Sequence, residues 1–353
     1  MRLGWREAAG IVLSAALLWW ALHDVQWPEV WAHLQRSNLP LLLLSAVVAT
    51  SIFPLRARRW RTILDPVEPG VPLGKLWRAT AVGMMVNNVI PARVGELVRV
   101  YALTREAPRV TFSAGFASLA VDRLFDAVVL FGLMLLSMFS PAFPRGARIG
   151  NQQVTHWVGG ATLGILALLA MLYLIVVFPA RVITLYEAFA RRVAPRYEER
   201  GKSILLAFAS GLGVLRRPAR FASVLAWTVL HWLVNAAAFW IGFRAVGIDA
   251  PYSAALFVQG LIAFGVALPS APGFWGIFEG AAKVGLAVYH VDPTRAVTWA
   301  IGYHLLSFIP ITVIGAFYFT RLGIHLKDVR RKADDDGSAD ESDAPPTAEA
   351  ARA

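Results

Sequence analysis

The chain has 353 residues, of which 57% are hydrophobic and 16% charged, and its formal net charge is +11. Such an apolar composition excludes an ordinary soluble domain and is typical of a protein that crosses a membrane several times. The chain contains no cysteine, which excludes disulfides, thiol nucleophiles and cysteine-based metal sites.

The charge is unevenly distributed along the chain. Residues 333–353 contain seven acidic side chains and one arginine, so residues 1–332 contain 33 basic and 16 acidic side chains, a net charge of +17. We attribute this excess to basic cytoplasmic loops that face anionic lipid, and we expect no nucleic-acid partner. The acidic tail is expected to be disordered, because its composition cannot bury a core.

The first two apolar runs predict two membrane crossings. Residues 8–22 follow two arginines and include a tryptophan pair typical of a membrane interface, although a cleaved signal peptide is an alternative. Residues 39–55 precede a cluster of four arginines, Arg56, Arg58, Arg59 and Arg61. This cluster predicts that the second helix ends in the cytoplasm and that the N-terminus lies there too. We assign it to topology and to attraction for lipid head groups.

Residues 77–106 predict a broken hairpin. A charged side chain at the centre of a spanning helix costs roughly 2.5–3.5 kcal/mol, and a proline removes a backbone donor. We expect the chain to enter from the cytoplasm, break between Pro91 and Gly95, and turn back. Irregular backbone at that depth is tolerated only where protein buries it or water reaches it, so this segment should line a cavity. Its polar members are Asn87, Asn88, Arg93, Glu96 and Arg99.

Residues 112–139 predict a long helix whose first half is polar. Asp122 and Asp126 are four residues apart and therefore share a face. Arg123 pairs squarely with neither from its own position and is expected to reach another element. A buried network that fixes helix packing is favoured over a proton or ion relay. No further ligand cluster supports a metal at the two aspartates, so we expect no metal and no cofactor.

The second half predicts crossings at 156–178, 221–246 and 296–320, and an interfacial helix at 203–215 that does not cross. His231, Asn235 and His304 are expected to form interhelical hydrogen bonds within these crossings.

Residues 253–290 predict a second interrupted hairpin. Its break contains Pro272 and Gly273, and Glu279 follows shortly after. Glu279 and Lys283 are one helical turn apart and are expected to pair.

These elements predict an all-α integral membrane protein with about six full spans and two broken re-entrant hairpins. Both hairpins have a proline and a glycine four residues apart with a glutamate close behind. By the predicted topology, the first enters from the cytoplasm and the second from the outside. This pattern predicts inverted pseudo-repeats, with halves of about 1–139 and 156–332 in a membrane domain of 1–332. The predicted cytoplasmic segments contain 24 lysines and arginines and the outer segments four, which predicts cytoplasmic termini.

Three stretches in order carry a resemblance to a known family: VNNVIPARVGELVRVY, the helix containing DRLFD, and LPSAPGFWGIFEGA. Over roughly residues 10–325 the chain resembles the membrane region of bacterial lysylphosphatidylglycerol synthases. This flippase-like family also includes stand-alone membrane proteins. The full-length synthases have a soluble aminoacyl-transferase domain, whereas only the acidic tail follows here. The resemblance therefore implies lipid handling or translocation without the synthase reaction.

The expected function is translocation of an anionic or amphiphilic lipid between the leaflets of the cytoplasmic (inner) membrane, without catalytic residues. The alternatives are a membrane-embedded head-group transferase and a non-transporting scaffold of a lipid-synthesis complex. The chain has no GxxxxGK[ST] motif, so a gradient or a partner, such as a separate lipid-modifying enzyme, should supply the energy. No oligomeric state is predicted. Candidate substrate-binding residues are Asn87, Asn88, Arg93, Glu96, Arg99, Asp122, Arg123, Asp126, Pro272, Gly273 and Glu279.

Overall fold

The structure is a computed structural model that describes residues 5–66, 68–90, 93–144, 178–193, 217–267 and 271–325, with shorter pieces between 146 and 206 and residues 328–329. The predicted crossing at 156–178 and the predicted interfacial helix at 203–215 lie largely outside the described residues. Pro91 and the acidic tail lie wholly outside them.

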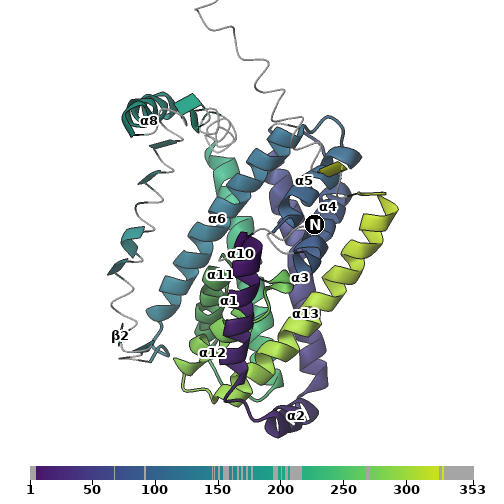
Figure 1. Cartoon of the computed structure of the whole chain (residues 1–353), viewed down its shortest axis with the longest axis vertical. Helices are drawn as coiled ribbons and strands as arrows, with labels where there is room; N and C mark the ends of the chain where they lie inside the picture. The colour runs from purple at the N-terminus through teal and green to yellow at the C-terminus, as the bar shows by residue number, and fades with distance from the viewer. Residues whose placement is uncertain are drawn as a thin grey trace, which may run out of the picture.

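The chain folds as an all-α membrane protein whose main helices run along the long axis of the molecule (Figure 1). The two short strands pair as one antiparallel hairpin. The elements are α1 Trp5–Leu22, α2 Trp27–Arg36, α3 Leu39–Leu64, α4 Leu73–Val89, α5 Gly95–Glu106, α6 Phe112–Met138, β1 Arg148–Ile149, β2 Gln152–Gln153, α8 Pro179–Val193, α10 Pro218–Ala245, α11 Tyr252–Ala267, η3 Pro272–Phe274, α12 Ile277–Ala287 and α13 Pro293–Arg321.

Three helices in the described part of the chain are long and apolar enough to cross a membrane, namely α3, α10 and α13. They have 26, 28 and 29 residues. At 1.5 Å per residue, each is about 40 Å long, which exceeds a hydrocarbon core of about 30 Å. They coincide with three of the six predicted crossings. Shorter apolar segments occupy Val12–Leu22 in α1 and the whole of α11.

The long helices are held together by a large apolar core and an interhelical aromatic cluster. α3 packs along α10, and Asn38, before α3, donates its backbone N–H to the carbonyl of Ala245 at the end of α10. Phe239 and Phe243 of α10 meet Trp299 of α13 edge to face, with ring centroids 5.1 and 4.6 Å away. Edge-to-face packing of this kind adds to the stabilisation from burial alone.

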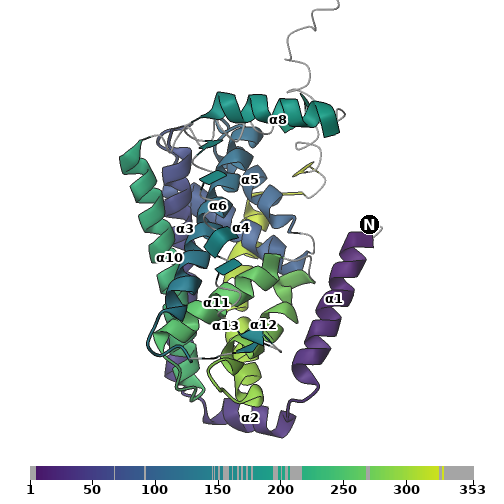
Figure 2. The same ribbon diagram turned by 90° about the vertical axis from the view of Figure 1, so that its left-hand side faces the viewer.

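Two short helices lie crosswise at opposite ends of the bundle. α2 covers the end where α3 begins, and α8 lies across the other end (Figure 2). Both end with basic side chains and begin at a proline or next to one. They therefore mark the two ends of the spanning helices.

The structure contains both predicted broken helix pairs. α4 and α5 lie toward the α8 end, and α11 and α12 lie toward the α2 end (Figures 1 and 2). The two breaks meet inside the bundle, where α4 contacts η3. Arg93 in the first break and Phe274 in the second both have left-handed backbone, with φ of 55° and 63°. Such conformations are strained for residues other than glycine.

The first pair is packed backbone against backbone. A Cβ on Gly95 would overlap the carbonyl oxygen of Gly83 and lie 2.5 Å from the side-chain oxygen of Asn87. On the other side of α4, a Cβ on Gly315 of α13 would overlap the carbonyl oxygen of Ala81. Glycines allow helices to approach this closely in membranes.

Candidate functional site

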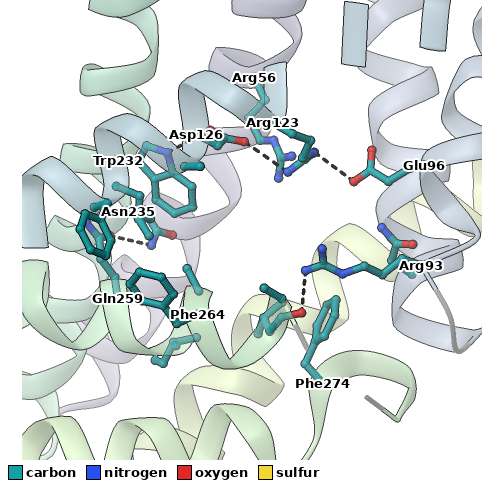
Figure 3. A pocket seen from close by; sticks show the side chains of 18 of the residues that line it. Arg56, Arg93, Glu96, Arg123, Asp126, Trp232, Asn235, Gln259, Phe264 and Phe274 are labelled. Atoms are coloured by element: carbon teal, nitrogen blue, oxygen red, sulfur yellow. Dashed lines mark hydrogen bonds and ion pairs between the residues drawn. The ribbon is translucent and has the colours of Figure 1, made fainter. Parts of the chain in front are cut away.

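A cavity of about 590 Å³ lies where the two breaks meet (Figure 3). Its lining has two chemical characters. Polar side chains line one part, namely Arg56, Asn87, Arg93, Glu96, Arg123, Asp126, Trp232, Asn235 and Gln259. Apolar side chains line the rest and include Leu130, Phe131, Phe239, Ile262, Phe264, Val266 and Phe274. The cavity can therefore hold an amphiphilic molecule.

Asp126 is the carboxylate that joins three helices at the polar wall. Its Oδ1 accepts from Arg59 Nη1 at 2.6 Å and from Trp232 Nε1 at 2.9 Å, and its Oδ2 lies 3.2 Å from Arg123 Nη1. These donors come from α3, α10 and α6. The buried carboxylate is thus paired and hydrogen-bonded, as burial of a charge requires.

Asp122 lies behind the cavity wall and is completely buried. Arg59 Nη2 lies 2.6 Å from its Oδ1, and Arg99 Nη1 lies 3.6 Å from its Oδ2. The Arg99 guanidinium also lies 4.0 Å from the ring centroid of Trp60, whose indole donates to Ser118. Asp122 and Arg99 therefore support the wall and do not line it. The predicted shared face of Asp122 and Asp126 is confirmed, because Arg59 binds both.

Arg123 reaches another element, as predicted. Its Nη2 lies 3.0 Å from Oε1 of Glu96 on α5. The expectation that Arg123 pairs with neither aspartate of its own helix was wrong, because its 3.2 Å contact with Asp126 spans one helical turn. Arg123 therefore connects Glu96 to the Asp126 network.

Arg93 connects the two breaks. Its Nη2 donates to the backbone carbonyl of Val266 at 2.7 Å, and its guanidinium lies 5.6 Å from the ring centroid of Phe274 (Figure 3). Its side chain is exposed at the cavity. Within the described residues, no carboxylate oxygen lies within 4.0 Å of its guanidinium. Its positive charge therefore has no ion-pair partner in the part of the chain that the structure describes.

Arg56 is the functional candidate that the sequence analysis missed. It lines the cavity and is only 7% exposed. Its one described hydrogen bond is to the sulfur of Met84, at 3.8 Å. No carboxylate of the described residues lies within 4.0 Å of it. The sequence assigns the whole arginine cluster to topology, and its spacing does not distinguish Arg56 from its neighbours; only the packing of α3 turns Arg56 toward the cavity.

The two asparagines have structural partners. Asn87 lines the cavity and accepts the backbone N–H of Gly95 at 2.9 Å, which joins α4 to α5 across the break. Asn88 donates to the hydroxyl of Thr312 on α13 at 2.8 Å. Gly273, which follows Pro272, packs near the backbone carbonyl of Asn88. Asn88, Pro272 and Gly273 shape the junction of the breaks but are not in the cavity lining.

Glu279 is completely buried and lies away from the cavity. Its Oε1 lies 2.7 Å from His304 Nδ1, and its Oε2 accepts the backbone N–H of Gly276 at 2.7 Å. The predicted interhelical bond of His304 is thus confirmed. The predicted Glu279–Lys283 pair was wrong, because Glu279 caps the start of its own helix. Lys283 instead pairs with Asp24, at 2.5 Å.

The Asp24–Lys283 pair joins the loop after α1 to α12. The Lys283 ammonium also lies 3.3 Å from the carbonyl oxygen of Ala21 at the end of α1. Its hydrogen bond to Asp24 lowers the pKa of that carboxyl below its usual value. This pair therefore fixes α1 against the second broken helix pair.

A hydrogen-bonded amide pair joins α10 to α11 at the cavity. Asn235 Nδ2 donates to Oε1 of Gln259 at 3.1 Å, which confirms the predicted interhelical role of Asn235. The predicted interhelical hydrogen bond of His231 was wrong, because neither nitrogen of this buried ring has a hydrogen-bond partner among the described residues and its Nδ1 lies 3.9 Å from Asp126. Gln259 and Trp232 were not predicted, since a single amide or indole in an apolar run carries no distinctive pattern. In the described part of the chain, no group of three His, Cys, Asp or Glu side chains could hold a metal ion.

The sequence is similar to a defined family of membrane proteins. A family model described as the lysylphosphatidylglycerol synthase TM region matches residues 8–315. A UPF0104 membrane protein of Pyrococcus horikoshii is 24% identical over 329 residues, which cover 87% of this chain and 93% of that protein. A UPF0104 membrane protein of Methanocaldococcus jannaschii is 19% identical over 67% of this chain and 93% of its own length.

A longer relative is named as an enzyme. The glycosyltransferase AglD of Haloferax volcanii is 26% identical over 330 residues. The match covers 87% of this chain but only 53% of AglD, so the chain spans about half the length of that relative.

Proposed function

Because the chain belongs to the family of the lysylphosphatidylglycerol synthase TM region, we propose that this multi-pass membrane protein moves an anionic lipid between the leaflets of the cytoplasmic membrane. In this proposal the lipid head group passes through the polar part of the cavity. The acyl or prenyl chains remain in the bilayer or against the apolar wall. Both termini lie in the cytoplasm.

The proposal rests on the cavity at the junction of the two broken helix pairs, because its lining is polar in one part and apolar in the other. Arg93, Arg123 and Arg56 offer planar donors that suit phosphate oxygens. The edge-to-face pair of Phe131 and Phe264, with centroids 5.0 Å apart, offers an apolar surface nearby. A binding site between interrupted helices from two halves of a chain is the usual arrangement in secondary transporters.

The broken pairs are, on this proposal, re-entrant hairpins. Each would enter the membrane from one side and end at the cavity, so that the cavity can be reached from either leaflet when one pair moves. Arg93 supports this assignment because it connects the two breaks through Val266 and Phe274.

A separate lipid-modifying enzyme is the proposed partner. AglD, named as a glycosyltransferase, matches this chain over about half of its length. A membrane region of this type can therefore occur together with a further part in one chain. A separate enzyme that makes or consumes the transported lipid would act together with the present protein in the same way.

The proposal is tested by leaflet exchange in proteoliposomes with fluorescent anionic lipids, in parallel with chemical analysis of the lipids. Exchange should fall at least about tenfold in Arg93→Ala, with only a small change in melting temperature, because this exposed side chain loses one carbonyl hydrogen bond and one contact with the Phe274 ring. Arg93→Lys should recover only part of the exchange, since an ammonium lacks the planar pair of donors that a guanidinium offers to a phosphate.

The matched control is Arg244→Ala, which removes an arginine that pairs with Asp249 outside the cavity. This variant should exchange lipid like the unmodified protein. No exchange above that of protein-free liposomes would overturn the proposal. A change in the chemical structure of the lipid would instead favour a head-group transferase.

A further inference from the structure

The charged side chains at the cavity and directly behind it do not balance. Three carboxylates, Glu96, Asp122 and Asp126, form the acidic part of the network. Five arginines, Arg56, Arg59, Arg93, Arg99 and Arg123, surround them. The described residues of this cluster therefore carry a net charge of +2. Arginine does not deprotonate in proteins, so the cluster cannot lose this charge by releasing protons.

The excess charge belongs to two particular side chains. Arg59, Arg99 and Arg123 each contact at least one of the three carboxylates within 4.0 Å. Arg56 and Arg93, in contrast, line the cavity without a carboxylate partner in the described part of the chain. Arg56 is nine-tenths buried, and a buried charge is unfavourable unless it is paired. Both guanidiniums therefore face a space that an anion can fill.

We infer that the cavity is a binding site for a phosphate group with two negative charges, held between Arg56 and Arg93, as in a lipid phosphomonoester or diphosphate. The inference rests on the proposed function and narrows its substrate class. A dianion neutralises the cluster completely. A phosphodiester lipid, with one negative charge, leaves one positive charge of the cluster unneutralised. A zwitterionic head group leaves two positive charges unneutralised, and a cationic head group leaves more than two.

The apolar wall indicates that the phosphate belongs to a lipid. Phe131, Phe264 and Leu130 line the same cavity, and free phosphate has no apolar part that could contact these side chains. Free phosphate, however, carries the same charged group that the two arginines would bind, and it is therefore included in the test.

The experiment measures equilibrium binding to the purified full-length protein in detergent. The ligands are dihexanoyl phosphatidic acid, a phosphomonoester; dihexanoyl phosphatidylglycerol, a phosphodiester; and inorganic phosphate. Each is titrated at pH 5.5 and pH 7.5, because a phosphomonoester gains its second charge at a pH of about 6. The phosphodiester keeps one charge throughout this range.

We expect phosphatidic acid to bind at least about tenfold more tightly than phosphatidylglycerol at pH 7.5, and its affinity to fall severalfold at pH 5.5. Phosphatidylglycerol should show no such pH dependence. Arg56→Gln should weaken binding of phosphatidic acid about tenfold and remove most of the pH dependence. Arg58→Gln is the matched control on the same helix, since Arg58 contacts Trp227 and Thr62 and does not line the cavity.

Equal affinities for the two lipids at both pH values would overturn the inference, as would unchanged binding in Arg56→Gln. If Arg56→Gln does not fold, Arg93→Gln replaces it, since this variant removes the other charge at an exposed position. Arg56→Lys, which keeps the charge, is then the variant to compare it with. Binding of inorganic phosphate as tight as that of phosphatidic acid would contradict the lipid assignment.

Failure of this inference and failure of the proposed function give different results. Selective binding of phosphatidic acid without leaflet exchange supports the site but contradicts transport. Leaflet exchange that is equal for phosphodiester and phosphomonoester lipids supports transport but contradicts the dianionic site.

Discussion

Arg93 and Phe274, 181 positions apart in the chain, contact each other with the guanidinium 5.6 Å from the ring centroid, and both have left-handed backbone. Each residue lies in the break of one helix pair. Strained backbone that is held by its surroundings is often found at functional sites. The two breaks therefore meet where the cavity offers a positive charge that has no carboxylate partner among the described residues.

The buried ion pairs of Arg59 should make a large contribution to stability. Arg59 is completely buried and lies 2.6 Å from both Asp122 and Asp126. Arg59→Ala leaves two carboxylates without this partner, and breaking a buried pair costs about 3–5 kcal/mol. Melting in detergent should show a marked loss of stability.

Arg61→Ala is the control for this prediction, on the same helix. Arg61 pairs with Asp65 at 3.7 Å, and both side chains are about one-third exposed. Such a surface pair contributes less than about 1 kcal/mol. Equal losses of stability in the two variants would show that the Arg59 pairs have no special role.

Gly95→Ala should destabilise the first broken pair. The added methyl group would overlap the carbonyl oxygen of Gly83, and a backbone atom cannot move aside as a flexible side chain can. Overpacking of this kind costs about 1–3 kcal/mol or more. Gly132→Ala in α6 is the control, since its methyl group would meet nothing within 4 Å. A melting temperature that falls equally in both variants would contradict the close packing.

The Asp24–Lys283 pair should make stability depend on pH at the acidic end. The pKa of Asp24 is lowered in the folded protein, chiefly by its hydrogen bond from Lys283. Its contribution is therefore complete above the unfolded pKa of about 3.9 and is lost as the pH falls through the lower folded pKa. Because Asp24 is 45% exposed, we expect less than about 1 kcal/mol.

The measurement for Asp24 is the melting temperature of the unmodified protein and of Asp24→Asn between pH 3 and pH 7. The variant should melt lower at pH 7, and the two curves should converge toward pH 3. A difference that stays constant over this range would refute the assignment of the effect to Asp24 ionisation.

The orientation in the membrane can be measured directly because the chain has no cysteine. Ala142 and Arg192 are exposed and lie near opposite ends of the bundle, after α6 and on α8. In whole cells, a membrane-impermeant maleimide should label Ala142→Cys, and it should label Arg192→Cys only after lysis. This follows from the excess of basic residues on the predicted cytoplasmic side. The opposite labelling pattern would show that the chain has the reverse orientation in the membrane.

The sequence was most informative where spacing alone determines geometry. The four-residue spacing of Asp122 and Asp126 predicted their common face, and proline and glycine predicted both breaks. Partners distant in sequence were not predictable in this way. Glu279 was assigned to Lys283, its neighbour on the helix, but binds His304, which only the packing of α12 on α13 brings close.

Arg56 shows a second limit of the sequence. In a run of four arginines, the statistical preference for cytoplasmic positive charge explains every member equally well. Only the rotation of α3 against α4, α6 and α10 decides that Arg56 and Arg59 turn inward, whereas Arg58 contacts Trp227 on α10 outside the cavity.

The glycine contacts of α4 restrict how the two broken helix pairs can move. The backbone of α4 packs against Gly95 of α5 on one side and against Gly315 of α13 on the other. Helix α4 therefore cannot slide without breaking rigid contacts on two sides. Around the second pair the contacts differ between its two helices. Gly276, at the start of α12, faces the backbone of α1 at Ser14 and Leu18, whereas Gly260 and Gly265 of α11 face the side chains of Met134 and Ile277. Side chains of this kind can change rotamer while helices shear past one another. The first pair and α12 would then form the stationary walls of the cavity, and α11 would be the helix that moves.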